Sequence, residues 1–114
     1  MQTLSLQDAI VLARRLHADG QSQRAAQICN AILTRDPSQF DCLSIMGVIS
    51  LQSGDMGMAA AYLQRAAGLR TDDAQLQTNL AAALQSLGKT DEAIAACRKA
   101  LAIAPNTLGA YQNL

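Results

Sequence analysis

Apolar residues recur along this chain with the period of an α-helix. In residues 73–86 they return at intervals of three and four, which places them on one helical face: Leu76, Leu80, Ala83 and Leu84. Gly88 can then take the left-handed conformation that ends a helix. A second helix is predicted to begin at a cap on Thr90 or Asp91 and to run through Ala102.

The same helix–turn–helix unit returns every 34 residues. Glycines at the predicted turns, and alanines five residues after them, keep this spacing: Gly20, Gly54 and Gly88, with Ala25, Ala59 and Ala93. Small residues form another column: Ala13, Gly47 and Ala81. A fixed period of this length indicates a repeat architecture. We therefore predict one domain over residues 1–114, with units at 6–39, 40–73 and 74–107, each made of a helix A and a helix B, and a partial fourth helix A at 108–114.

The first two units contain signals for helix ends and helix weakness. Ser5 can cap the first helix, and Pro37 stops helix B of the first unit before Ser38 caps the next helix. Gly57 and Gly68 lie inside the predicted helix B of the second unit, where each glycine costs about 0.5–1 kcal/mol relative to alanine.

These columns resemble the tetratricopeptide repeat family. Its pattern has Leu-Gly or Leu-Ala in helix A, glycine at the turn, alanine five residues later and proline near the end, and residues 79–106 (NLAAALQSLGKTDEAIAACRKALAIAPN) are close to it. The first two units match more loosely, with Ser50 in place of a bulky residue and Thr71 in place of proline. The resemblance implies an all-α fold: a right-handed superhelical solenoid of antiparallel helix pairs, with about seven helices.

The resemblance also implies a protein–protein interaction scaffold that binds a peptide or partner segment in a concave groove. In the family, helix A lines this groove, through its second, fifth, sixth, ninth and twelfth positions. On this sequence the predicted groove residues are Gln7, Ile10, Val11, Arg14, His17, Asp41, Ser44, Ile45, Val48, Gln75, Thr78, Asn79, Ala82, Gln112 and Asn113. Packing against the neighbouring unit is an equally good interpretation of Ile45.

Two subtypes of the family can be compared with these positions. The chaperone-binding subtype holds terminal carboxylates with a clamp of lysine and asparagine; this chain has Ile10 and Arg14 there, so the clamp is missing. The repeat arm of O-linked N-acetylglucosamine transferases carries asparagine at the sixth position, which Asn79 and Asn113 match in two of four units. A side-chain amide there can pair with a peptide backbone, although asparagine is frequent at this position throughout the family. A substrate-binding arm of a larger, glycosyltransferase-like enzyme is the alternative function.

The last seven residues look like the opening turns of a fourth helix A. Because a solenoid usually finishes with a polar capping helix, we expect these units to be the N-terminal repeats of a longer bacterial protein, truncated at Leu114. A further alternative is a self-assembly module, in which Leu108, Tyr111 and Leu114 form an apolar edge that pairs two copies into a homodimer.

Charge and hydropathy exclude several partners. The nine basic and nine acidic residues give a net charge of zero without a basic stripe, so neither nucleic acid nor a membrane surface is expected as partner. The sequence has no apolar run of membrane-spanning length and no signal-peptide pattern, so we expect a cytoplasmic protein.

Candidate chemistry is sparse. Cys29, Cys42 and Cys97 lack the spacing of metal ligands. Cys29 and Cys97 share one column of the repeat and are expected in the core, whereas Cys42 is expected early in helix A of the second unit. His17 is the sole histidine and is expected on the surface or in the groove. No nucleophile is paired with a base, and no glycine-rich phosphate loop is present. We therefore expect no catalytic residue, no metal, no cofactor and no enzymatic activity in this chain.

Overall fold

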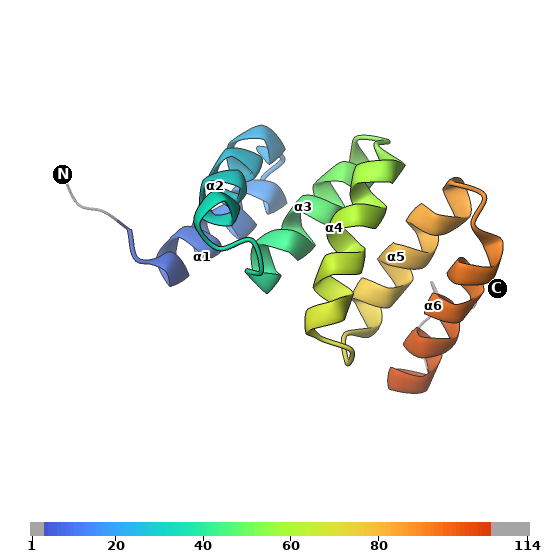
Figure 1. The fold of residues 1–114 in the computed structure, drawn as a ribbon. Coiled ribbons are helices and arrows are strands. Elements are labelled where there is room, and N and C mark those ends of the chain that lie inside the picture. Colours follow the sequence, from blue (N-terminus) through green and yellow to red (C-terminus); the bar gives the residue numbers. More distant parts are fainter. Residues whose placement is uncertain (1–3, 106–114) are drawn as a thin grey trace.

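The computed structural model describes residues 4–105, and within them every regular element is a helix. The helices follow one another as three hairpins: α1 (Leu6–Ala18) and α2 (Ser22–Arg35), α3 (Phe40–Gln52) and α4 (Met56–Leu69), and α5 (Ala74–Ser86) and α6 (Thr90–Ile103) (Figure 1). The predicted all-α solenoid of helix pairs is confirmed. The predicted fourth helix A, residues 108–114, lies outside the described residues.

Each helix A ends at one of the periodic glycines. These are the described residues with positive φ: Gly20 at 83°, Gly54 at 83° and Gly88 at 77°. Lys89, directly after Gly88, takes the cap position of α6. Its N–H donates to the carbonyl of Leu84 at the end of α5. The prediction that Thr90 or Asp91 caps this helix is therefore wrong, since both residues already lie in its first turn.

The side chains of Ser5 and Gln39 cap the first turns of α1 and α3. The hydroxyl of Ser5 accepts from the N–H of Asp8 at 3.1 Å, as predicted. Ser38 does not cap α3, because α3 begins only at Phe40 and its cap position falls on Gln39. The Gln39 side-chain oxygen accepts from the N–H of Cys42 at 3.0 Å and satisfies this helix end instead.

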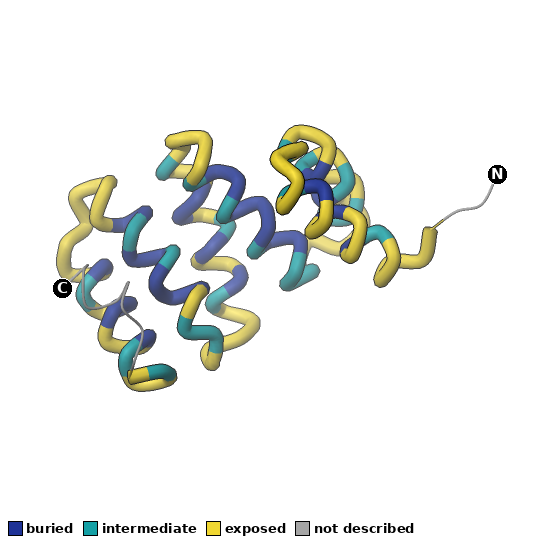
Figure 2. The backbone as a smooth tube through the Cα atoms, turned by 180° about the vertical axis from the view of Figure 1, so that it is seen from behind, coloured by how far each residue is buried: buried dark blue, intermediate teal, exposed yellow. Residues whose placement is uncertain are grey.

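The A helices lie on the inner side of the solenoid. Backbone contacts join α1 to α3 and α3 to α5, whereas in the described part of the chain none joins α2 to α4 or α4 to α6. The B helices therefore splay apart on the outside, which curves the stack. The three stacked hairpins have extents of 50 × 25 × 24 Å. Burial is greatest along α3 and α5, each of which buries seven of its 13 residues (Figure 2).

Small side chains set the distance between the two helices of a unit. Ala13 and Ala81 are 0% exposed. Their equivalent, Gly47, has no room for a side chain, since a Cβ there would lie 2.5 Å from the Cδ2 atom of Leu63 on α4. The periodic columns of the sequence are thus the contact surfaces between helices A and B.

Candidate functional site

The predicted groove residues differ in how far the structure exposes them. Four are exposed: Gln7, Val11, Arg14 and Gln75. Six are half-buried: His17, Asp41, Ser44, Val48, Asn79 and Ala82. Three are buried: Ile10, Ile45 and Thr78. Gln112 and Asn113 lie outside the described residues.

The three buried positions support the inner helices. Ile10 and Ile45 are 2% and 8% exposed and belong to one hydrophobic cluster that joins the first two units. The hydroxyl of Thr78 donates to the carbonyl of Ala74 at 3.0 Å and is thereby satisfied within its own helix. A ligand in the groove would therefore mainly meet the ten more accessible residues.

Six of the predicted residues meet in one hollow, which we call the junction hollow. Its volume is about 260 Å³, and its lining comes from all three A-helix segments: Arg14 and His17 of α1, Phe40, Asp41, Ser44, Ile45 and Val48 of α3, and Asp73 at the start of α5. Sequence reasoning missed Phe40 and Asp73 because the family positions begin inside helix A. Asp73 could have been identified from its role as the N-cap of α5, because a cap side chain lies at the first turn of its helix.

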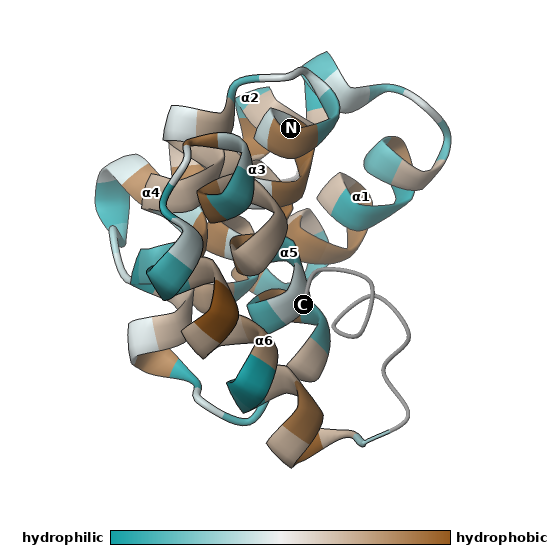
Figure 3. Ribbon diagram, turned by 90° about the vertical axis from the view of Figure 1, so that its right-hand side faces the viewer, coloured by the Kyte–Doolittle hydropathy of each residue, from teal (hydrophilic) through white to brown (hydrophobic). Residues whose placement is uncertain are grey.

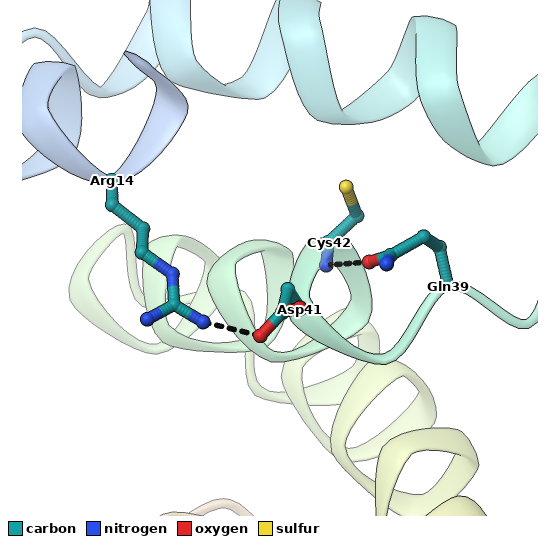
Figure 4. A network of polar contacts seen from close by, with 4 residues as sticks. All are labelled: Arg14, Gln39, Asp41 and Cys42. Carbon is teal, nitrogen blue, oxygen red and sulfur yellow. Dashed lines mark hydrogen bonds and ion pairs between the residues drawn. The ribbon is translucent and has the colours of Figure 1, made fainter. Parts of the chain in front are cut away.

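Two polar contacts tie the first unit to the second across this surface. Arg14 reaches from α1 to the first turn of α3, where its Nη2 atom forms an ion pair with Oδ1 of Asp41 (Figure 4). The Arg14 side chain is 60% exposed, so this pair contributes at most about 1 kcal/mol. Nearby, His17 Nε2 and Gln52 Oε1 are 2.7 Å apart.

Ser44 and Asp73 add two more polar side chains to the lining of the junction hollow. The hydroxyl oxygen of Ser44 is buried and has no hydrogen-bond partner within the described part of the chain. At the edge, Oδ1 of Asp73 accepts from the N–H of Leu76 at 3.0 Å. Phe40 forms a cation–π contact with Arg70, whose guanidinium carbon lies 4.2 Å from the ring centre.

The inner face changes character at the third unit. Gln75 Nε2 donates to Asn79 Oδ1 at 3.1 Å, which orients the Asn79 side chain. Among the described residues the amide nitrogen of Asn79 donates no hydrogen bond, so it is available to an incoming carbonyl. Ala82 follows one turn later, so this end of the groove is neutral and carries little bulk.

The three cysteines are buried in the hydrophobic core. Burial, together with a smaller effect of the neighbouring Cys42 thiol, raises the pKa of the Cys29 thiol to about 12. Burial also raises the pKa values of Cys42 and Cys97. All three thiols are 0% exposed and are protonated at neutral pH, so they behave as small apolar side chains.

The described residues form no group that could hold a metal ion, and Ser44 and His17 do not form a hydrogen-bonded pair. Residues 4–105 contain no group of three or more His, Cys, Asp and Glu side chains that could hold a metal ion. Ser44 and His17 line the same hollow, but among the hydrogen bonds of this range none joins them. Within the same range, no helix has both the length and the apolar character needed to cross a membrane.

A second hollow, of about 740 Å³, lies between α4, α5 and α6, outside the predicted groove. Its walls are rich in alanine, including Ala67, Ala95 and Ala96. Tyr62 occupies the position of Ala96 in the preceding unit and packs there against both large core clusters. The hollow thus lies where the third unit has alanine in place of the tyrosine of the second unit. Figure 3 shows this end of the solenoid, where apolar and polar residues alternate along α6.

A family model described as "Tetratricopeptide repeat" matches residues 74–107. Among known sequences, the chain is similar to "Cellulose synthase operon protein C" of Pseudomonas fluorescens (strain SBW25), with 30% identity over 92 residues. These residues are 81% of this chain but 7% of that much longer protein.

Solved structures resemble the fold over nearly all of its length. A crystal structure of the MamA protein is 25% identical with a TM-score of 0.85, and the match covers 94% of this chain and 58% of MamA. An O-GlcNAc transferase of Thermobaculum terrenum is 24% identical with a TM-score of 0.83, and the match covers 94% of this chain and 21% of the transferase. The chain therefore spans only part of each of these proteins, and the transferase likeness concerns the fold alone.

Proposed function

We propose that this chain, which is a tetratricopeptide repeat protein, is an interaction scaffold that binds a peptide or partner segment in the concave groove formed by α1, α3 and α5. The observation that supports the proposal is the row of accessible side chains that these helices present at equivalent positions. Arg14, Val48 and Ala82 stand 34 residues apart on successive A helices. Each follows a residue packed against helix B, so the scaffold holds the row in a fixed geometry.

The row offers different contacts to different parts of one extended guest. Val48 supplies apolar surface in the middle of the groove, beside the charged groups of Arg14 and Asp41. Asn79 supplies an amide donor to a peptide carbonyl at the third unit. A peptide that lies along all three helices would form charged contacts at the first and second units and backbone hydrogen bonds at the third.

A peptide selected from a random displayed library on the intact chain provides the probe for this proposal. Its dissociation constant is then measured on wild type, Val48→Glu and Asn79→Ala by calorimetric titration. Ala61→Glu, an exposed position on the outer helix α4, is the matched control. The proposal expects at least a tenfold loss for Val48→Glu and an unchanged constant for Ala61→Glu. Unchanged affinity in both groove variants would remove the groove from consideration.

A second candidate is a substrate-binding arm of a larger transferase, and the oriented amide of Asn79 favours it. The similarity of the fold to the transferase of Thermobaculum terrenum supports this candidate at the level of architecture. Reading the gene beyond the codon for Leu114 tests it. A glycosyltransferase-like domain in the same frame would support the arm, and a stop or further repeats alone would count against it.

Self-assembly through Leu108, Tyr111 and Leu114 stays a prediction, since these residues lie outside the described range. A concentration series in light scattering tests it: a mass that doubles with concentration in wild type but not in Tyr111→Glu supports the homodimer. A mass that stays monomeric at millimolar concentration contradicts it. A cytoplasmic location and the absence of catalysis in this chain also remain predictions.

A further inference from the structure

The junction hollow holds more hydrogen-bond acceptors than its own residues use. Asp41 engages Oδ1 with Arg14, and Asp73 engages Oδ1 with the N–H of Leu76. Among the described residues, no further hydrogen bond engages the second oxygen of either carboxylate. The buried hydroxyl oxygen of Ser44 is also without a partner in that range. An unsatisfied buried polar atom costs about 1–3 kcal/mol, so a group that satisfies it is favoured.

The charges that line the hollow do not cancel. Asp41 and Asp73 carry one negative charge each, and Arg14 carries the positive charge that its contact with Asp41 offsets. With His17 neutral, the lining has a net charge of −1. The two acids stand on different A helices, so a cation between them would bridge the second unit and the third.

We propose that the junction hollow receives a basic side chain, an arginine or a lysine, of the segment bound in the groove. The guanidinium or ammonium group lies between the carboxylates of Asp41 and Asp73 and donates to their unengaged oxygens, and the Ser44 hydroxyl, buried until then, turns to accept from it. Its methylene stem packs on Val48, which lines the same hollow. This inference rests on the proposed function, because it names the side chain that a groove-bound partner would present.

An anionic side chain fits the hollow less well. It could contact the guanidinium nitrogens of Arg14 that Asp41 does not engage, but it would then lie beside the carboxylates of Asp41 and Asp73, which repel it. The two ligand charges therefore predict opposite effects for one substitution. Removal of the Arg14 charge should strengthen the binding of a cation and weaken the binding of an anion.

Three blocked pentapeptides test the ligand charge: acetyl-Ala-Ala-Xaa-Ala-Ala-amide with arginine, glutamine or glutamate at the centre. Their binding to the full chain is followed at pH 8, where histidine side chains are ordinarily neutral, through the NMR shifts of the Ser44 and Val48 amides. The arginine peptide is expected to bind more tightly than the other two. Asp73→Asn should weaken it about three- to fivefold, the range of a partly exposed charge pair, while asparagine keeps the helix cap.

Two further variants make the test specific. Arg14→Gln should tighten the arginine peptide by a similar factor, about three- to fivefold. Asp72→Asn removes an exposed carboxylate next to Asp73 that does not line the hollow, and it should leave the constant unchanged. Circular dichroism confirms that each variant keeps its helices.

The outcomes separate this inference from the proposed function. Tighter binding of the glutamate peptide, no shift with any peptide at millimolar concentration, or a constant insensitive to Asp73→Asn would each overturn the basic-side-chain site. If the library-selected peptide still loses affinity with Val48→Glu, the groove function stands while the site falls. If that peptide is insensitive to both Val48→Glu and Asn79→Ala, the groove function itself falls.

Discussion

The helix crossing of the second unit is built differently from those of the first and third. In the outer two units an alanine on helix A shares a core cluster with a cysteine on helix B: Ala13 with Cys29, and Ala81 with Cys97. In the second unit Gly47 lies against Leu63. A larger residue on helix B is thus matched by the loss of a Cβ on helix A.

Because the smaller residue on helix A offsets the larger residue on helix B, the A helices keep equivalent positions in the three units. Arg14, Val48 and Ala82 each directly follow the small residue of the crossing, so the position of the crossing sets the position of the groove residue. If Leu63 lay against an alanine, helices α3 and α4 would have to separate, and Val48 would move relative to its equivalents. Packing between helices therefore determines the geometry of the inner face.

The largest effect is expected where the second crossing loses its leucine. Leu63→Ala removes a side chain that is 0% exposed and leaves a cavity, which should cost about 2–5 kcal/mol in the free energy of unfolding. Urea denaturation followed by circular dichroism measures this loss. Leu69→Ala, at a 47% exposed position of the same helix, is the control and should change the free energy far less. Equal losses at the two positions would contradict the crossing described here.

The glycine of the crossing gives a sharper test through a change of sign. Gly47→Ala places a Cβ 2.5 Å from Leu63 Cδ2, and overpacking of this kind should cost about 1–3 kcal/mol. In the Leu63→Ala background the clash is gone, and the same substitution should instead stabilise α3 by about 0.5–1 kcal/mol through helix propensity. A double-mutant cycle measures the coupling. Additive free energies would show that the two residues do not determine each other's size.

The smallest effect distinguishes a required glycine from a dispensable one in the same unit. A Cβ on Gly68 would meet no atom within 4 Å, so Gly68→Ala should stabilise the protein by about 0.5–1 kcal/mol. Gly54→Ala also meets open space but has a φ of +83°, so it should destabilise the turn. A rise in melting temperature for the first variant and a fall for the second are expected. The opposite order would contradict the assigned helix end.

The fold could be predicted because its signals are local or periodic. Positive φ at Gly20, Gly54 and Gly88 follows from glycine's place at every turn, and the capping role of Ser5 follows from its side chain. The capping role of Gln39 could not be predicted in the same way, because glutamine is not among the preferred cap residues. Its role depends on the residue at which α3 begins after Pro37, which is Phe40.

The site was less predictable because its contacts join separate units. The ion pair of Arg14 with Asp41 spans 27 positions of the sequence, and the contact of His17 with Gln52 spans 35. Neither charge pattern nor helical period identifies such partners. The family positions also say nothing about depth, so the burial of Ile10 emerged only from the packing of α1 on its neighbours.

A map of NMR amide shifts on binding of the library-selected peptide to the intact chain tests directly whether the concave groove holds the partner. We expect the largest shifts along the inner helices, at Val11, Val48 and Asn79, and little change in the outer helices. Shifts concentrated around the hollow between α4 and α6, at Gln64, Ala95 and Lys99, would place the partner on the convex side. That result would contradict the concave groove as the binding surface.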